Sequence, residues 1–416
     1  MSFLCDCFSK KRITCLLGSG ATIPVGGPTT HQITQAARVK SQHVFDPISN
    51  DWINVQFIDE VANRLDNFLA PVPCHFEDIF HALESLESIH IGWQSSAVEK
   101  YKPRLAAFVQ AADARWFNSM WLIAAKQSLV EAIAEQVELS NNNFQTNTIH
   151  DWFKSFWVEA FSVAAWDIAT LNYDNLLEQI SPELEDGFEL LSNWARFNAI
   201  RLLRTKKSRM LHLHGSIHFG YLPLHEERTF IDYGEDLCKY RLHSEARQSW
   251  FGRSPNTAQS HEEAIIGPLI TGLRKTDKIT VHPYDDYQAV FRRCIYKQSS
   301  LLIAGYSFGD LYLNSVMNRM LGLHGSKRRI VIVTWFPRPS DEWHCDPITL
   351  YQNYGWPNEE MYSAFGASMN SINPLGTSLI YCDKLVSADG CCRIYLGGTQ
   401  EAFQKYGDEI LDFLLS

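Results

Sequence analysis

Four short motifs rich in glycine or polar residues each follow a short apolar run with strand character, and this arrangement constrains the fold most strongly. The motifs are Gly18-Ser19-Gly20-Ala21, Asn172-Tyr173-Asp174, His214-Gly215-Ser216 and Gly305-Tyr306-Ser307-Phe308-Gly309-Asp310. In an open, mostly parallel sheet, ligands bind in the crevice beyond the carboxyl ends of the strands. Polar residues that end separate strands can therefore meet there, although they lie far apart in the sequence. The pattern predicts a nucleotide site.

Alternating strand-like and helical segments predict an α/β fold with a Rossmann-like, doubly wound parallel sheet. Strands are expected at the apolar runs 13–17, 167–171, 211–213, 301–304 and 329–333. Helical runs lie between several of these strands, notably at 287–298 and 311–321. We assign residues 1–45 and 160–340 to this nucleotide-binding domain.

Apolar residues recur with helical spacing from Asp51 to about Ser140, so residues 46–159 are predicted to form a large helical insertion. The run Asn141-Asn142-Asn143 is expected to break the helix that precedes it. A further aromatic helix is expected from Trp152 to Val163.

The polar segment 222–267 is expected to be a loop-rich cover over the site. Residues 341–416 are predicted to be a C-terminal α/β extension that completes the same unit as the sheet. In this extension, two short strands are expected after Thr377, followed by a closing amphipathic helix at 402–415.

Composition excludes several classes of function. The net charge of −10 argues against binding nucleic acid by bulk electrostatics, so no direct nucleic-acid partner is expected. No apolar run approaches the ~20 residues that span a bilayer, and no signal-peptide core is present, so we expect a cytoplasmic protein without a membrane partner. The ten cysteines are scattered and expected to be reduced, and no group of Cys and His has the spacing of structural zinc.

The glycine motif suits a phosphate loop. Gly18 and Gly20 would let backbone N–H groups approach a pyrophosphate, with Ser19 and Ala21 in the same turn. The third glycine of the strict dinucleotide fingerprint is absent, so a generic tight turn is an equal alternative. Thr29 is expected to cap a helix from Thr30 to about Val39.

Two further motifs offer groups for sugar and amide chemistry. Asn172 and Asp174 alternate on an extended segment and so point the same way, which suits a carboxamide or a ribose hydroxyl. Alternatively, Asp174 or Asn175 caps the helix that follows. His214 ends a strand before a glycine, where a near-neutral imidazole could take a proton from a sugar hydroxyl, although a structural role is an equal alternative.

The last motif has two interpretations. Gly305 and Ser307 would admit an adenosine ribose, and Asp310 could accept hydrogen bonds from hydroxyls or cap the next helix. The same spacing fits the nucleophile elbow of serine hydrolases. The downstream His324 and His344 have no recognisable strand-end context, so the hydrolase is the weaker interpretation.

Taken together in this chain order, the four motifs resemble the NAD-site motifs of sirtuin-like (SIR2-type) domains. The segment His75-Phe76-Glu77-Asp78-Ile79 with Ala82-Leu83-Glu84 resembles a helical element of the bacterial defence branch of that family. Protein-deacylating sirtuins carry a zinc-ribbon module with two CxxC pairs, which this sequence lacks. The resemblance therefore implies a bacterial antiphage NADase, and its length and helical insertion suggest the sirtuin-like subunit that partners a HerA-type ATPase.

The resemblance implies an NAD+ glycohydrolase that depletes NAD in an infected cell, with NAD+ as its substrate and no metal. Asn172 would orient the ribose and a water molecule, and His214 would contact ribose hydroxyls or act as general base. The remaining implied NAD contacts are Gly18, Ser19, Gly20, Ala21 and Thr29 in the phosphate loop, Asp174 at the carboxamide, and Gly305, Ser307 and Asp310 at the adenosine end.

The chain is also expected to form a regulated homo-oligomer. The main alternative is a subunit that senses NAD or ADP-ribose and regulates a partner ATPase without cleaving anything. An NAD-dependent protein deacylase is the third interpretation. The presence of both Asn172 and His214 favours catalysis, because a sensor would not need the pair.

Overall fold

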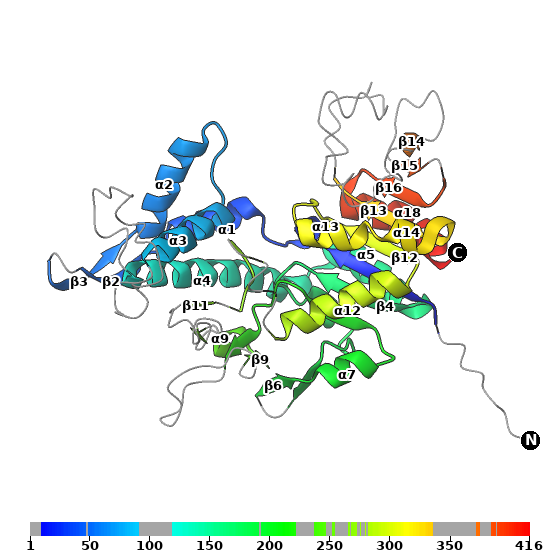
Figure 1. The fold of residues 1–416 in the computed structure, drawn as a ribbon, viewed down its shortest axis with the longest axis horizontal. Coiled ribbons are helices and arrows are strands. Elements are labelled where there is room, and N and C mark those ends of the chain that lie inside the picture. The colour runs from blue at the N-terminus through cyan, green and yellow to red at the C-terminus, as the bar shows by residue number, and fades with distance from the viewer. Residues whose placement is uncertain are drawn as a thin grey trace, which may run out of the picture.

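An eight-stranded sheet forms the centre of the computed structural model (Figure 1). Six neighbouring strands are parallel, in the order β7 (Arg209–His212), β4 (Ala165–Thr170), β1 (Arg12–Leu17), β12 (Ser300–Ala304), β13 (Arg329–Val333) and β16 (Cys392–Tyr395). Two antiparallel strands, β15 (Lys384–Ser387) and β14 (Ile372–Pro374), extend the β16 edge. The model describes residues 10–46, 49–90, 119–190, 193–221, 237–246, 252–253, 265–266, 268–272, 275, 279, 282–335, 372–374, 384–387 and 389–416.

The order of the parallel strands determines where a ligand can bind. The chain begins in the middle at β1, adds β4 and β7 on one side, and then crosses to β12, β13 and β16 on the other. This is the strand order of doubly wound dinucleotide-binding folds, and it places the topological switch point between β1 and β12. The predicted α/β class is therefore confirmed, and the crevice is expected where the loops after β1 and β12 diverge.

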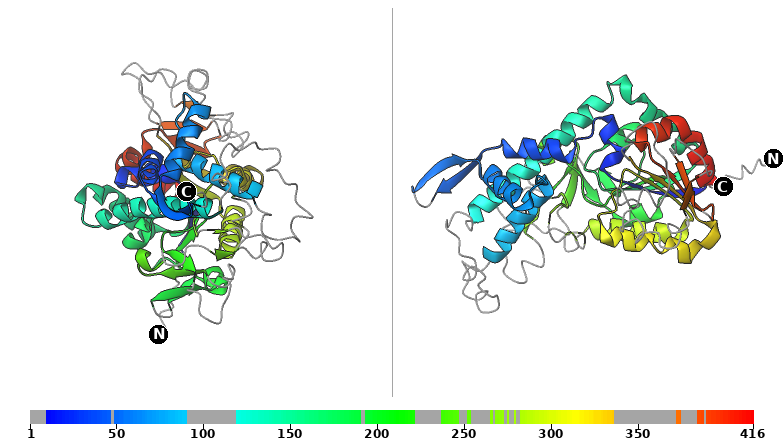
Figure 2. Two further views of the ribbon diagram at one scale, coloured as in Figure 1. Left: turned by 90° about the vertical axis from the view of Figure 1, so that its left-hand side faces the viewer. Right: turned by 90° about the horizontal axis from the view of Figure 1, so that it is seen from above.

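Helices cover both faces of the sheet because successive strand residues point to opposite sides. On one face, Leu16, Leu301 and Ile303 pack in a core with α12 (Tyr284–Lys297) and α13 (Leu311–Met317). On the other face, Cys15 and Leu302 pack with α5 (Asp151–Val163) and α18 (Gly398–Leu415). Figure 2 shows the red α18 and the yellow helices on opposite sides of the strands.

A second core lies beside the sheet, on the left in Figure 1. It is built by α1 (Thr30–Arg38), α2 (Phe57–Leu69), α3 (Phe76–His90) and α4 (Ser119–Phe144) with the hairpin of β2 (Gln42–Asp46) and β3 (Asp51–Val55). The 26-residue α4 runs from this helical lobe to the sheet, and Leu129 and Ile133 are fully buried along it. The domain limits proposed from the sequence remain a prediction.

Two expectations for the helical lobe are wrong. Residues 51–55 form a strand instead of a helix, because they pair with β2, where Trp52 stacks on His43. The Trp121 side chain of α4 donates a hydrogen bond to the carbonyl of Phe45 and so anchors this hairpin.

The asparagine run does not end the preceding helix, since α4 continues to Phe144. Asn141 is buried, and its side-chain oxygen accepts a hydrogen bond from the backbone N–H of Asn175 at 3.3 Å.

Smaller elements complete the described part. A four-stranded antiparallel sheet has the order β5 (Phe188–Leu190), β6 (Trp194–Phe197), β9 (Leu237–Tyr240) and β8 (Phe219–Tyr221), and a two-stranded ladder joins β10 (Gly252–Arg253) to β11 (Ile265–Ile266). The remaining short helices are α6 (Leu176–Ile180), α7 (Ala199–Arg204), α9 (His243–Ala246) and α14 (Met320–His324).

The outcome of the other secondary-structure predictions varies. The helices expected at 152–163 and 287–298 are confirmed by α5 and α12, and the expected closing helix by α18. The stretch expected to be a helix at 311–321 is divided into α13 and α14. Most of the predicted cover at 222–267 lies outside the described residues. Among the helices that the structure describes, none combines the length and apolar character needed to cross a membrane.

Candidate functional site

A cavity of about 320 Å³ lies at the carboxyl ends of the central strands, and we call it the strand-end cavity. Four loops contribute to its lining: Gly18 and Ser19 after β1, Asn172 and Asp174 after β4, His214 after β7, and Gly305, Ser307 and Asp310 after β12. The predicted site residues Gly20, Ala21 and Thr29 are absent from the described lining. The topology thus brings residues of all four motifs to one cavity.

The glycine turn and the loop after β12 pass each other in direct backbone contact. The N–H of Gly18 donates to the carbonyl of Ala304, and the N–H of Gly20 donates to that of Gly305, both at 3.0 Å. Gly305 has a φ of +64°, and a Cβ added to it would lie 1.9 Å from the backbone nitrogen of Ala21. Position 305 therefore needs glycine because the loop after β12 passes directly against the glycine turn after β1.

Two helices meet the glycine turn and its continuation. Residues Ser19–Ala21 form a 3-10 turn, and Thr30, the first residue of α1, lines the strand-end cavity. Thr29 caps α1, as predicted, by accepting a hydrogen bond from the N–H of Gln32. From the opposite end of the sequence, the Thr399 hydroxyl of α18 donates to the carbonyl of Gly20 at 3.1 Å. The turn is therefore held from outside by α18.

Asn172 is oriented by the glycine turn. Its Nδ2 donates to the carbonyl of Gly18 at 3.1 Å and to the hydroxyl of Thr22 at 3.3 Å. Because a carbonyl oxygen can only accept, the amide nitrogen must face the turn, which leaves Oδ1 as the accepting atom. Asn172 is only 8% exposed and lines the strand-end cavity. The side chain therefore presents a fixed hydrogen-bond acceptor at this site.

His214 faces a carboxylate from another strand end. Its backbone carbonyl accepts a hydrogen bond from the N–H of Ile270 at 2.8 Å, which fixes the chain beyond β7. Its Nε2 lies 3.5 Å from Oδ2 of Asp310. The other oxygen of Asp310 caps α13 by accepting from the N–H groups of Tyr312 and Leu313. One carboxylate therefore joins the helix terminus to the imidazole.

The environment keeps the Asp310 carboxyl group ionised. Burial alone would raise its pKa, but the neighbouring His214 ring, the N–H of Leu313 and the charge of Lys275 together lower the pKa below its usual value. A negative charge therefore stands beside the imidazole at neutral pH.

Residues 167–351 match the family model of the SIR2-like domain. The match begins in β4 and includes every strand-end motif except the glycine turn. A crystal structure described as a Sir2 homolog in complex with NAD aligns with 12% sequence identity and a TM-score of 0.38, covering 98% of this chain and 91% of that chain. A search of curated proteins gives no match.

Asp174 lines the strand-end cavity within the segment that matches the SIR2-like domain. Burial raises the pKa of its carboxyl group to about 6, and the nearby Glu178 charge contributes in the same direction. Its Oδ1 accepts a hydrogen bond from the N–H of Leu176, the first residue of α6, at 3.3 Å. Asn175 occupies the N-cap position of α6 but makes no side-chain cap bond, so Asp174 supplies a bond to the helix start while it also lines the cavity.

A buried ionic cluster supports the strand that leads to His214. His212 Nε2 lies 2.9 Å from Glu178, and the Lys239 ammonium lies 2.6 Å from Asp186 and 3.5 Å from Glu178. Burial opposes ionisation of Glu178, but these two neighbours lower the pKa of its carboxyl group to about 2. Glu178, Asp186 and His212 are close enough to hold a metal ion, but the Lys239 ammonium already contacts both carboxylates. The cluster therefore ties β7, α6 and β9 together.

The sequence motifs did not reveal several residues at the strand-end cavity. Thr22 contacts the Asn172 amide, and Tyr173 lines the strand-end cavity. Glu77 and Lys275 also line it and form an ion pair at 3.2 Å. Glu77 lies in the segment 75–79, whose resemblance to a helical element of a known family was a weak signal. Lys275 has no recognisable motif around it.

Proposed function

We propose that this chain is an NAD+ glycohydrolase, in which water replaces nicotinamide at the ribose carbon to give nicotinamide, ADP-ribose and a proton. The observation that carries the proposal is that Asn172 and His214, from different strand ends, line one cavity beside a glycine turn. The match to the SIR2-like domain supports NAD+ as the substrate.

Asn172 is proposed to position the nucleophile. Breaking the nicotinamide–ribose bond develops positive charge on the ribose carbon, and nicotinamide is already a good leaving group, so positioning can replace strong acid catalysis. Because Gly18 and Thr22 hold the amide nitrogen, Oδ1 is free to accept a hydrogen bond from water or a ribose hydroxyl. This bond would hold the water oxygen toward the ribose carbon.

His214 is proposed to take the proton. It would accept a proton from the attacking water or from a ribose hydroxyl and later release it to solvent. The Asp310 carboxylate at 3.5 Å would stabilise the imidazolium that forms. We therefore assign Asp310 to the support of His214 in preference to the adenosine end.

The remaining lining residues are proposed to hold the substrate. The N-terminal end of α1 at Thr30 and the ammonium of Lys275 supply positive potential for the pyrophosphate. Asp174, largely ionised at pH 7, would accept hydrogen bonds from the carboxamide NH₂ of nicotinamide. Gly305 and Ser307 would lie against the adenosine ribose.

The proposal extends to the biological setting that the sequence resemblance implies. In that setting, a cytoplasmic homo-oligomer depletes NAD in antiphage defence and is regulated with a HerA-type ATPase. The motifs and the helical insertion support this part of the proposal.

Incubation of the purified full chain with NAD+, followed by chromatography of the products, tests the activity. The reaction should be run alone, with a HerA-type ATPase, and with an acetylated peptide. Equal amounts of nicotinamide and ADP-ribose without peptide are expected. NAD+ binding without nicotinamide release under any condition would indicate a sensor, and release only with peptide would indicate a deacylase.

A further inference from the structure

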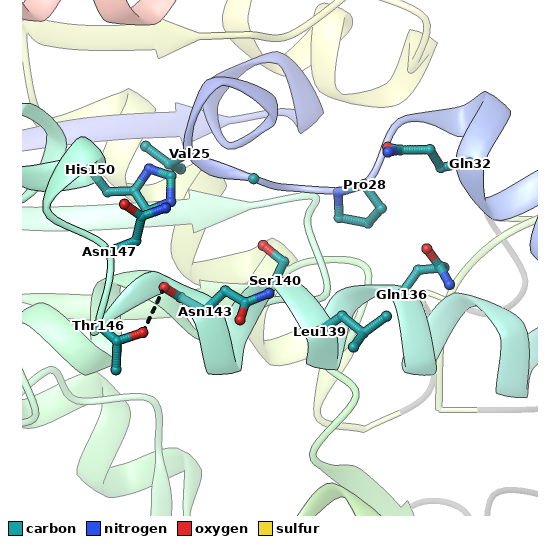
Figure 3. Close-up of a pocket in the computed structure, with 11 residues that line it drawn as sticks. Val25, Pro28, Gln32, Gln136, Leu139, Ser140, Asn143, Thr146, Asn147 and His150 are labelled. Atoms are coloured by element: carbon teal, nitrogen blue, oxygen red, sulfur yellow. Dashed lines mark hydrogen bonds between the residues drawn. The ribbon is translucent and has the colours of Figure 1, made fainter.

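A second cavity, of about 670 Å³, shares Pro28 with the strand-end cavity (Figure 3). We call it the polar groove, and its polar lining includes Gln32, Gln136, Ser140, Asn143, Asn147 and His150. We propose that the polar groove binds an uncharged nucleoside, recognised by its sugar hydroxyls and by the hydrogen-bonding edge of its base. This inference does not depend on NAD+ cleavage.

One face of α4 builds the floor of the groove. Gln136, Leu139, Ser140 and Asn143 are spaced by three or four residues, which places them on the same side of a helix. This face exists because α4 continues through the asparagine run. The opposite wall comes from the loop that carries Val25 and Pro28, and Figure 3 shows the α4 side chains facing that loop.

Two buried polar atoms at the groove have no hydrogen-bond partner among the described residues. Ser140 is 4% and His150 is 6% exposed, and neither the Ser140 hydroxyl nor Nδ1 of His150 makes a hydrogen bond there. A Cβ added to Gly26 would lie 3.9 Å from both the Ser140 hydroxyl and Nε2 of His150. The two side chains therefore approach the same point of the loop from two different elements. Buried polar groups normally have hydrogen-bond partners, so the partner expected for these two atoms is a polar ligand in the groove.

The charge of the lining selects an uncharged ligand. The described lining contains no Lys, Arg, Asp or Glu. Burial and the nearby Lys154 charge lower the pKa of His150, so its ring is neutral at pH 7 and offers one donor and one acceptor. Lys154 itself is paired with Asp151 at 3.2 Å. A phosphate or carboxylate in the groove would thus lose water without gaining a counter-charge.

The remaining features select a nucleoside among uncharged ligands. Amides and hydroxyls donate as well as accept, as sugar hydroxyls and base edges require. Val25, Pro28 and Leu139 supply apolar surface against which a planar base can pack. The volume falls within the roughly 300–1,000 Å³ of small-molecule sites.

Isothermal titration calorimetry of the full chain with adenosine, guanosine, cytidine and uridine tests the proposal, with AMP and ribose as further arms. At least one nucleoside should bind, more tightly than ribose and more tightly than its phosphorylated counterpart. Absence of binding by all four nucleosides would overturn the proposal, as would ribose binding as tightly as a nucleoside, or AMP binding more tightly than adenosine.

Two exposed neighbours on α4 give a matched pair of variants. Asn143→Trp fills the groove, whereas Asn142→Trp changes an exposed residue outside its lining. Nucleoside binding should be lost in the first variant and unchanged in the second. Leu139→Trp, at a position 57% exposed, provides a second way to fill the groove if Asn143→Trp does not fold. Full binding in a folded groove-filling variant would place the nucleoside elsewhere and overturn the proposal.

Discussion

Asp310→Asn separates two possible roles of this residue, which are the support of His214 and contact with the adenosine end of NAD+. Asparagine keeps the oxygen that caps α13, and it is as good an N-cap as aspartate, so the helix should be retained. The substitution removes the negative charge 3.5 Å from His214. Two opposite unit charges at this separation interact by about 5 kcal/mol at an effective dielectric constant of about 20.

Only part of this interaction energy between the two charges is expected to appear as a higher activation barrier. In the proposed reaction the imidazole would be only partly protonated in the transition state, and the asparagine dipole would compensate for some of the lost charge. We therefore expect the barrier to rise by about 2–3 kcal/mol, which lowers kcat roughly 30- to 150-fold. The KM for NAD+ should change little, because Asp310 is assigned to His214 and not to the adenosine.

Steady-state measurement of nicotinamide release gives kcat and KM for the wild type and for Asp310→Asn. Asp310→Ala should add a loss of about 1 kcal/mol in the free energy of unfolding, since it removes the cap as well. A variant with unchanged kcat and a large rise in KM would refute the assignment and restore Asp310 to the adenosine end.

Three further predictions, which use four substitutions, test the site. Asn172→Ala should abolish nicotinamide release without unfolding the chain. Thr22→Val removes one of the two partners of the same amide nitrogen and should lower kcat by only about fivefold. Equal losses of kcat in the two variants would argue against a direct role for the Asn172 oxygen. Gly305→Ala should lower the free energy of unfolding, measured by urea titration, by more than about 3 kcal/mol, because the added Cβ would overlap the backbone of Ala21. A loss below about 1 kcal/mol would contradict this packing. Asp174 has a folded-state pKa of about 6, above its ordinary value of 3.8, so the wild type should lose about 3 kcal/mol of stability as the pH rises from about 4 through 6. Asp174→Asn should show no such loss. If the difference in the free energy of unfolding between the wild type and Asp174→Asn stays constant across these pH values, the raised pKa of Asp174 is contradicted.

The strand ends were predictable because their signals are local. The apolar run that ends at Leu17 is followed directly by glycine, and the run before Gly305 has the same form. Such segments identify buried parallel strands without knowledge of their neighbours. The sheet topology then places their ends together, so four motifs could indicate one crevice.

Pairings between distant residues could not be read in this way. Nothing in the sequence around Asp310 indicates that its carboxylate faces His214, because the contact depends on how β12 and β7 are placed in the sheet. The ion pair between Glu77 and Lys275 has the same origin. Contacts of this kind are set by tertiary structure and leave no periodic pattern.

Tertiary contacts also overrode two local signals. Asparagine favours helix ends, yet Asn141 stays within α4 because its side chain bonds to the backbone of Asn175. The helical spacing around Trp52 was misleading because pairing with β2 determines the conformation there. In the first case the missed contact also hid the polar groove, whose floor is the continued helix.

The bond from Thr399 to Gly20 has a consequence for biosynthesis. A ribosome makes the glycine turn before α18, so a nascent chain lacks this brace, and the cover that α18 gives to one sheet face, until α18 has been added. Partly translated chains would consequently hold an unbraced turn, and the strand-end cavity would gain its full support only after α18 has folded against the sheet.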